Sequence, residues 1–217
     1  MADMDALKVI LGSVVANLGI VAAMFFAASM TNSAAVWAGA ILSLAVCGIQ
    51  VPLLVAARDA ADRGGRIQPL RAIFSGLLPF GGGGVFAVIN GLRHLWNPQT
   101  LSDPVSGYIA LCGVVGISGY ALMRSYNALE GAQAQDPGVS MLFAQNAVAT
   151  LSAAIAFAAL AAHHGTGVAA YDANGSIAVG VLMFGMAVWL TGAAQSAAGQ
   201  SAAGQSAAGQ SGMASQE

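Results

Sequence analysis

Charged residues are scarce in this sequence: only 7% of the 217 residues are Asp, Glu, Lys or Arg, whereas 57% are hydrophobic. A soluble domain carries about a quarter charged residues, so a water-soluble globular protein is excluded. The net charge of −2 is too small to indicate nucleic acid as a partner. The composition therefore predicts an integral membrane protein with the lipid bilayer as its first partner.

Cysteine is almost as scarce, since only Cys47 and Cys112 are present, both in apolar runs far apart in the sequence. They indicate neither a disulfide framework nor a cysteine-based zinc site. The sequence also lacks a nucleotide-binding loop, a nucleophile with its base and a haem-ligating pair, so neither an enzyme nor a bound cofactor is predicted. The N-terminus has no cleavage site after a short hydrophobic core, which favours a retained first helix over a signal peptide.

Long hydrophobic runs, in contrast, are abundant. A hydrocarbon core about 30 Å thick needs roughly 20 apolar residues per helix. Six stretches meet this length, at approximately 9–28, 34–56, 70–92, 105–123, 139–162 and 176–190, the last extensible in either direction. Only residues 30–33 separate the first two, which predicts a helical hairpin. The predicted fold is an all-α bundle of six transmembrane helices within residues 1–192.

The basic residues predict the orientation in the membrane, because cytoplasmic loops retain lysine and arginine. Arg93 alone falls on one side of the six predicted spans. Six basic residues fall on the other side, which includes the N-terminus: Lys8, Arg58, Arg63, Arg66, Arg71 and Arg124. Both termini are therefore predicted to be cytoplasmic.

The sequence after the last span is a repeat. Residues 197–211 contain Ala-Ala-Gly-Gln-Ser three times, and an imperfect copy precedes them. A period of five matches neither a helix face nor a strand face, and the segment has no large apolar side chains for a core. We therefore expect residues 193–217 to be a low-complexity tail, with no ordered soluble domain after Leu190.

Glycine gathers at one place in the third span, where Pro79 is followed by glycines at 81–84. A tight crossing with a neighbouring helix explains such a run, because small residues allow membrane helices to approach closely. A hinge is the alternative. We favour the crossing.

Several stretches resemble the cation diffusion facilitators. The run FFAASMTNSAAVWAGAILSLAVCGIQ is similar to the first loop and second helix of that family, and FGGGGVFAVINGLRHLWNP to the third helix and its following loop. LSDPVSGYIAL is similar to the entry to the fourth helix. MLFAQNAVATLSAAIAF, followed by HHGTG and YDANGSIAVGVLM, is similar to helices five and six. The resemblance covers all six predicted helices.

The resemblance implies proton-coupled efflux of a divalent cation, typically zinc, through a tetrahedral site on helices two and five. It places a histidine and an aspartate of the family at Leu42 and Val46, and a glutamate and an aspartate at Gln145 and Asn146. None of these four residues is ionisable, whereas zinc–proton exchange needs imidazoles and carboxylates. The resemblance also implies a cytoplasmic ferredoxin-like domain after helix six, and we expect the repeat tail in its place. No metal ligand is predicted.

Polar side chains near these positions have two interpretations. Gln145 and Asn146 are expected to form hydrogen bonds between helices; the alternative is a residual polar site that also uses Ser43. His163 and His164 are expected in an interfacial loop without a metal role, since adjacent side chains diverge and no third ligand is near. For Asp172, a carboxylate favoured by the dipole at a helix N-terminus is sufficient.

Three functional hypotheses follow. In the first, the chain keeps the family's helical domain, is inactive in transport, and serves as a structural or accessory subunit that binds other membrane protein chains in a homodimer or larger complex. In the second, it transports a divalent cation, zinc or another, through an altered site. A third hypothesis is that the site has been neutralised deliberately.

Overall fold

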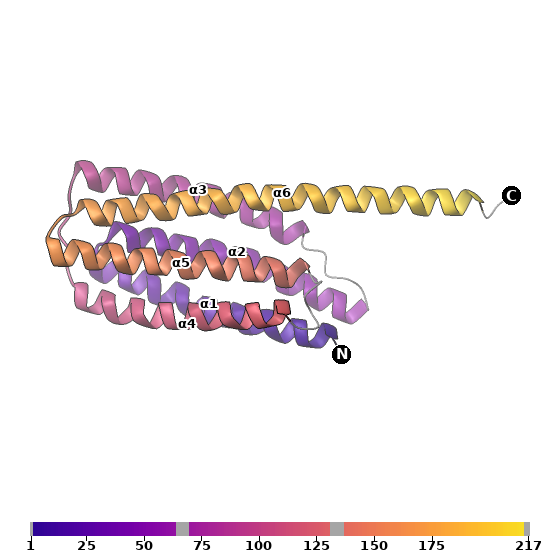
Figure 1. Ribbon diagram of the computed structural model, residues 1–217, viewed down its shortest axis with the longest axis horizontal. Helices are drawn as coiled ribbons and strands as arrows, with labels where there is room; N and C mark the ends of the chain where they lie inside the picture. The colour runs from indigo at the N-terminus through magenta and orange to yellow at the C-terminus, as the bar shows by residue number, and fades with distance from the viewer. Residues whose placement is uncertain (1, 64–69, 131–136, 215–217) are drawn as a thin grey trace.

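A computed structural model describes residues 2–63, 70–130 and 137–214 (Figure 1), and these residues form helices and short connections without a strand. All six predicted helices are present. They are α1 (Ala2–Thr31), α2 (Ala34–Arg63), α3 (Leu70–Trp96), α4 (Pro104–Glu130), α5 (Pro137–Thr166) and α6 (Ala170–Ala214). Each is longer than its apolar run, because polar residues at the ends continue the helical backbone beyond the hydrophobic segment.

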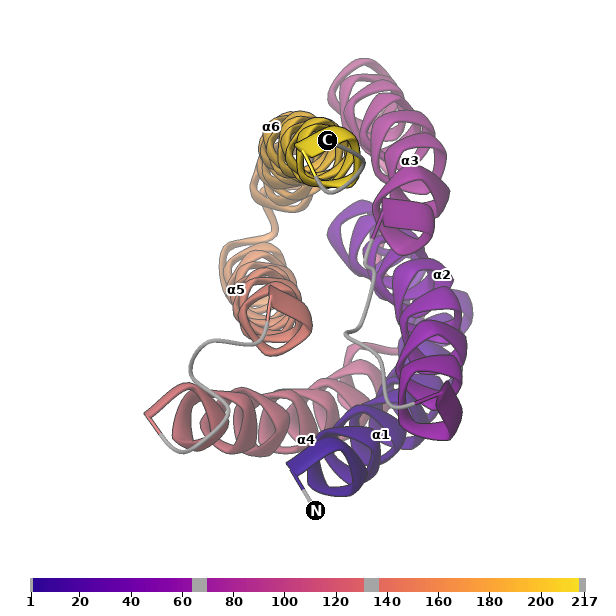
Figure 2. The same cartoon turned by 90° about the vertical axis from the view of Figure 1, so that its right-hand side faces the viewer.

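The helices run alongside one another in a single bundle. Viewed from its end, α1, α2 and α3 form one side, α5 and α6 form the other, and α4 joins α1 to α5 (Figure 2). The closest pairing is between α3 and α6, and α2 contacts both of them as well as α1 and α5. We call the end with the N-terminus and the end of α6 the terminal end (Figure 1). The opposite end, with the α1–α2, α3–α4 and α5–α6 connections, is the turn end.

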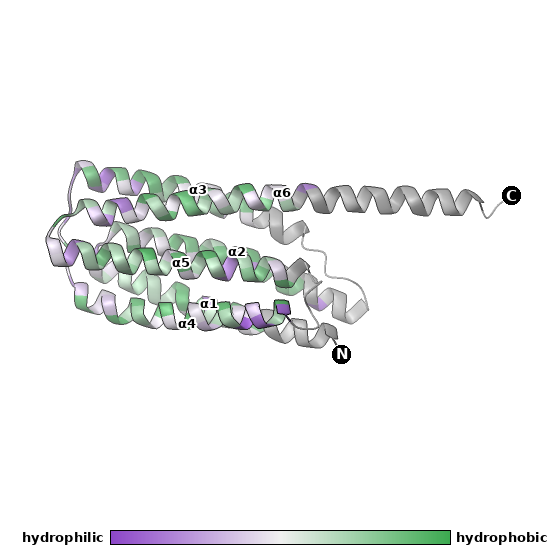
Figure 3. Ribbon diagram, in the orientation of Figure 1, coloured by the Kyte–Doolittle hydropathy of each residue, from purple (hydrophilic) through white to green (hydrophobic). Residues whose placement is uncertain are grey.

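Hydrophobic residues run along the helices, and hydrophilic ones gather toward the two ends of the bundle (Figure 3). Within the described residues, five helices are long and apolar enough to cross a membrane. The described residues of α3 fall outside this set, while the predicted bundle of six helices is present.

The predicted hairpin between the first two helices is confirmed. Asn32 forms the turn in a left-handed conformation (φ 56°), which asparagine tolerates better than most residues. Its backbone N–H donates to the Ala28 carbonyl at 3.1 Å. This turn brings the start of α2 to the turn end, next to the start of α6.

The glycine run in α3 lies at a close crossing with α6. A Cβ added to Gly84 would stand 3.2 Å from the Gly180 carbonyl oxygen, and one added to Gly83 would collide with Met183. Gly91 repeats this arrangement further along, since its added Cβ would meet the Ala173 carbonyl oxygen at 2.7 Å. The crossing interpretation is therefore supported, and the α3 helix continues without interruption through the run.

The sixth helix differs from its prediction at both ends. It begins at Ala170, and it continues through the repeat to Ala214 as one helix of 45 residues that projects beyond the rest of the bundle (Figure 1). The five-residue period is no obstacle to a helical backbone, because alanine and glutamine favour helix and the segment contains no proline.

Candidate functional site

The side of α2 that carries Leu42 and Val46 is apolar and dry. Both side chains are completely buried, and they share one core cluster with Met141, Leu142 and Ala149 of α5. Because residues four apart lie on one side of a helix, the two positions present hydrocarbon where α2 packs on α5.

Gln145 lies on the side of α5 that enters this cluster, one turn after Met141 and one turn before Ala149. Its side chain is fully buried, yet neither Oε1 nor Nε2 has a hydrogen-bond partner. A buried polar group left unpaired costs about 1–3 kcal/mol. The expected hydrogen bond between helices is therefore wrong for Gln145, because the residues that share its side of α5 are apolar.

Asn146, the next residue, behaves as predicted and bonds between helices. Its Nδ2 donates to the Ser125 hydroxyl (3.3 Å) and to the Ala121 carbonyl (3.4 Å), both on α4. Its Oδ1 lies 3.5 Å from Nδ2 of Asn17 on α1. Adjacent positions on α5 therefore have opposite environments, since one amide is bonded and the other is not.

The bonds of Asn146 continue through α1 to α2. Asn17 Nδ2 lies 3.1 Å from Gln50 Oε1, and Gln50 Nε2 donates to the Ser13 hydroxyl at 3.3 Å. All of these side chains are buried. We call the group the amide cluster; its members are Ser13, Asn17, Gln50, Ser125 and Asn146. Amides and hydroxyls do not titrate near neutral pH, so the cluster cannot exchange protons for a cation.

A small cavity of about 50 Å³ reaches the amide cluster between α1, α4 and α5. Ser13, Ser125 and Asn146 contribute to its wall, and the volume is enough for a few water molecules. Among its described lining residues the only charged one is Arg124. A guanidinium at this position repels a cation that approaches Asn146.

Ser43 is only partly available as a ligand. Its hydroxyl is buried and donates to the Gly39 carbonyl one turn earlier in α2, at 2.9 Å. The hydroxyl oxygen can still accept, but it is a neutral and weak ligand for a transition metal.

The two histidines lie in the last turn of α5, not in the loop that was expected. They diverge as adjacent positions must: His163 is buried with Nδ1 unpaired, whereas Nδ1 of the exposed His164 lies 3.1 Å from the Tyr108 hydroxyl. Across the described part of the chain, no group of three or more His, Cys, Asp or Glu residues could hold a metal ion.

Comparison with known families identifies the helical domain. The model of the cation efflux transmembrane domain matches residues 10–191, which cover most of the chain. The chain belongs to the cation diffusion facilitator family. No curated protein matches it in a sequence search.

Membership of the cation diffusion facilitators, together with the apolar helices, makes the chain a multi-pass integral membrane protein of a transporter family. The match ends at 191, so the repeat in the second half of α6 lies outside the family domain. The family assignment rests on the whole helical domain.

Two polar residues of this family member were missed in the sequence, and the role of a third was predicted only in part. Asn17 and Gln50 each stand in an apolar run, and that isolation was a usable signal, because polar residues in membrane helices commonly bond to neighbouring helices. Asp172 was assigned only to the dipole of its own helix. In the structure its buried carboxylate also accepts from the Ser33 hydroxyl and from the backbone N–H groups of Ala34 (2.6 Å) and Ala35 (3.2 Å). It therefore caps the N-terminus of α2 from α6.

Proposed function

We propose that this cation diffusion facilitator does not carry out proton-coupled zinc efflux and that it acts as a structural or accessory subunit in the membrane. The observation that carries the proposal is the burial of Leu42 and Val46 in a hydrocarbon cluster with α5, together with the neutral side chains of the buried Gln145 and Asn146. A single charge near the centre of a membrane costs about 3 kcal/mol or more. A dication at these positions has no anion to offset that cost.

Proton coupling is missing for a separate reason. Exchange of zinc for protons needs ligands that bind either species, such as histidine and carboxylates. The amide cluster has only neutral donors and acceptors, and Arg124 at the adjoining cavity carries a positive charge. Neither a proton nor zinc is held by such groups near neutral pH.

Transport is tested by zinc flux into sealed proteoliposomes under an imposed pH gradient. We expect no flux above protein-free vesicles. If flux is found, two matched variants show whether it depends on this site. Asn146→Ala removes an amide at the site, and Asn127→Ala removes an exposed amide on α4. Zinc flux that is lost in Asn146→Ala and kept in Asn127→Ala would contradict the proposal.

The accessory role requires a partner in the membrane, either a second copy or other chains. Large exposed apolar side chains such as Leu78 (84%) and Val188 (73%) leave area for lipid or for another protein chain. Light scattering of the detergent-purified chain gives the mass of the protein part alone. A dimeric mass supports the homodimer. A monomeric mass from native membranes, under mild detergent and with no co-purified chain, contradicts the subunit role.

The second candidate function is divalent cation transport through an altered site of Ser43, Gln145 and Asn146. One observation favours it: the buried Gln145 amide has no partner, and its oxygen suits a hard cation. Calorimetry with Zn²⁺, Mg²⁺ and Mn²⁺ tests this candidate. Stoichiometric binding that disappears in the Gln145→Ala, Asn146→Ala variant supports it over the accessory role.

We also propose that the terminal end of the bundle faces the cytoplasm, on the six-to-one distribution of basic residues. In a background without Cys47 and Cys112, Ser102→Cys at the turn end should react with an external impermeant thiol reagent. Glu130→Cys at the terminal end should react only after permeabilisation. Equal labelling of both in intact cells would contradict this orientation.

A further inference from the structure

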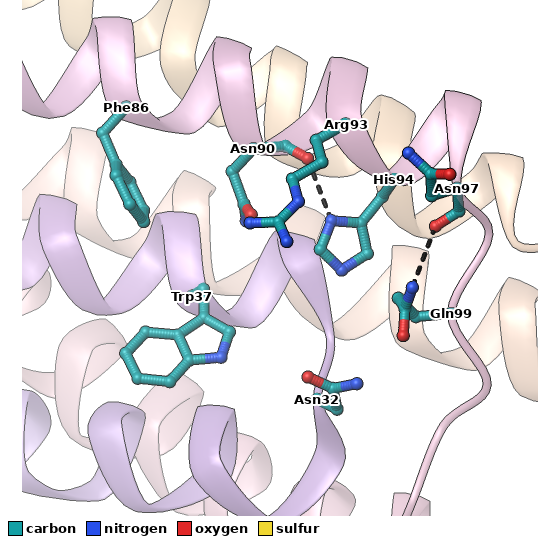
Figure 4. A pocket seen from close by; sticks show the side chains of 8 residues that line it. All are labelled: Asn32, Trp37, Phe86, Asn90, Arg93, His94, Asn97 and Gln99. Carbon is teal, nitrogen blue, oxygen red and sulfur yellow. Dashed lines mark hydrogen bonds between the residues drawn. The ribbon is translucent and has the colours of Figure 1, made fainter.

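A cavity of about 380 Å³ opens at the turn end, where α2 begins and α3 ends. Its volume is within the range of about 300–1,000 Å³ that ligand sites occupy. Figure 4 shows its wall, which includes Asn32, Trp37, Phe86, Asn90, Arg93 and His94. It is remote in the bundle from the amide cluster, which shares no lining residue with it.

The charge in this cavity is uncompensated. Arg93 is the only Lys or Arg on this side of the predicted topology, and no described lining residue is acidic. In the described residues it has no ion pair. A guanidinium left without a counter-ion at a membrane–water boundary favours an anionic ligand.

The polar groups beside Arg93 add hydrogen-bond donors. Nδ2 of Asn90 is buried and has no partner, and Figure 4 shows the Asn90 side chain next to the Arg93 guanidinium, both reaching from α3 toward Trp37. The His94 Nδ1 lies 2.9 Å from the Asn90 carbonyl, an acceptor, so Nδ1 carries the hydrogen and the ring is held in place. The Arg93 guanidinium and the Asn90 side-chain amide together suit the oxygen atoms of one anion, and His94 lines the wall beside them.

The opposite part of the cavity is aromatic. Trp37 is positioned by an edge-to-face contact with Phe25, with ring centroids 5.8 Å apart. Phe86 is 44% exposed and belongs to an outward apolar side of α3 with Val85 (48%) and Ile89 (60%). The cavity is therefore polar toward Arg93 and continuous with apolar surface on its other side. A ligand with a charged head and hydrocarbon chains matches both parts.

We propose that this cavity binds a phosphate-bearing anion, with Arg93 and Asn90 on the phosphate oxygens and Trp37 and Phe86 beside its apolar part. Arginine suits phosphate because its planar donors bind two oxygens at once. The continuity with the outer side of α3 favours an anionic phospholipid headgroup as the source. Free phosphate shares the head chemistry and is the other source. The proposal is independent of metal transport.

The test uses the fluorescence of Trp37 in the full-length chain. Of the three tryptophans, the Trp96→Phe and Trp189→Phe changes leave only the one in the cavity. The protein in an uncharged detergent is titrated with phosphatidylglycerol, with phosphatidylcholine of the same chain length, and with inorganic phosphate. We expect a saturable change with phosphatidylglycerol, and at least tenfold weaker binding in Arg93→Gln.

Two further variants separate the effect of the cavity from the effect of net charge. Asn90→Leu should weaken binding severalfold without a change in charge. Arg58→Gln removes an exposed arginine at the terminal end and should leave the titration unchanged. Saturation by inorganic phosphate at similar concentrations supports the anion site and assigns it to a soluble ligand. Equal responses to the two lipids, or equal affinities in Arg93→Gln and Arg58→Gln, would overturn the proposal.

Discussion

The centre of the bundle, around Leu42, Val46 and Gln145, and the turn end both bury polar side chains. The two regions differ in the hydrogen bonds that these side chains receive. At the turn end the carboxylate of Asp172 accepts hydrogen bonds from the hydroxyl of Ser33 and from two backbone N–H groups at the start of α2. In the centre, Gln145 is buried among apolar residues with no partner at all. A helix N-terminus supplies unpaired donors and a favourable dipole, whereas the middle of a helix has already used its backbone groups.

This difference explains where the chain can keep a buried acid. A carboxylate in low dielectric is stable only when several donors are directed at it. Asp172 has such donors at the start of α2, whereas Leu42 and Val46 lie in the middle of α2 among apolar side chains of α5. A neutral site in the centre is therefore the arrangement with the lower desolvation cost.

The difference between the two regions is tested most strongly by placing ionisable ligands in the centre. The combined changes Leu42→His, Val46→Asp, Gln145→Glu and Asn146→Asp should create zinc binding that calorimetry detects and that weakens as pH falls. This is the largest effect expected, because zinc sites with such ligands gain roughly 10 kcal/mol or more, while the parent chain should show no binding.

A neutral control separates charge from polarity in that experiment. Leu42→Gln with Val46→Asn makes the same positions polar without an ionisable group, and it should not bind zinc. Stoichiometric zinc binding by the parent chain, lost when Gln145 and Asn146 become alanine, would show that the centre is already a metal site.

The next largest effect should come from removing the buried acid at the turn end. Asp172→Ala leaves the donors at the start of α2 unpaired and should lower the free energy of unfolding by about 3 kcal/mol. Asn174→Ala, an exposed position two residues further along α6, should change it by less than about 0.5 kcal/mol. Reversible denaturation in mixed micelles measures both, and equal effects would refute the cap.

Within the centre, two adjacent amides should respond with opposite signs. Gln145→Met removes a buried amide that has no partner and should raise the free energy of unfolding by about 1 kcal/mol. Asn146→Leu removes the bonds to α1 and α4 and should lower it by about 2 kcal/mol. The same denaturation experiment compares them. Destabilisation by both changes would mean that Gln145 is also bonded.

The smallest effect concerns the cap of α4 at the turn end. Asp103 accepts from the hydroxyl (2.5 Å) and backbone N–H (3.2 Å) of Ser106, and these bonds hold the pKa of its carboxyl below the ordinary value. A depressed folded pKa stabilises the protein above the unfolded pKa, about 3.9, and the contribution is lost as pH falls through the folded value.

Ser106→Ala should therefore reduce the loss of stability during acid titration below about pH 4. Ser102→Ala, in the loop before Asp103, is the matched control and should titrate like the parent chain. Thermal unfolding between pH 2 and pH 6 gives the comparison. Identical pH dependence in Ser106→Ala and the parent chain would show that this bond does not contribute.

Much of the fold could be predicted from the sequence because each span depends on a contiguous run of apolar residues. The hairpin at Asn32 and the proline at the start of α5 are equally local signals. The absence of ionisable groups at Leu42, Val46, Gln145 and Asn146 was also visible in the sequence alone, once the family resemblance marked those positions. The contacts between different helices could not be predicted in this way, because a single apolar run does not indicate which helices pack against it.

The sequence by itself determined six helices, a membrane environment and a neutral centre, since composition and hydrophobic length decide these properties residue by residue. Tertiary structure alone decided which polar groups are paired. Gln145 and Asn146 have similar chemistry, and only their directions on α5 leave one without a partner and bring the other to Asn17. The cap from Asp172 to Ala34 joins residues 138 positions apart. Packing brings such groups together, so no local pattern in the sequence records them.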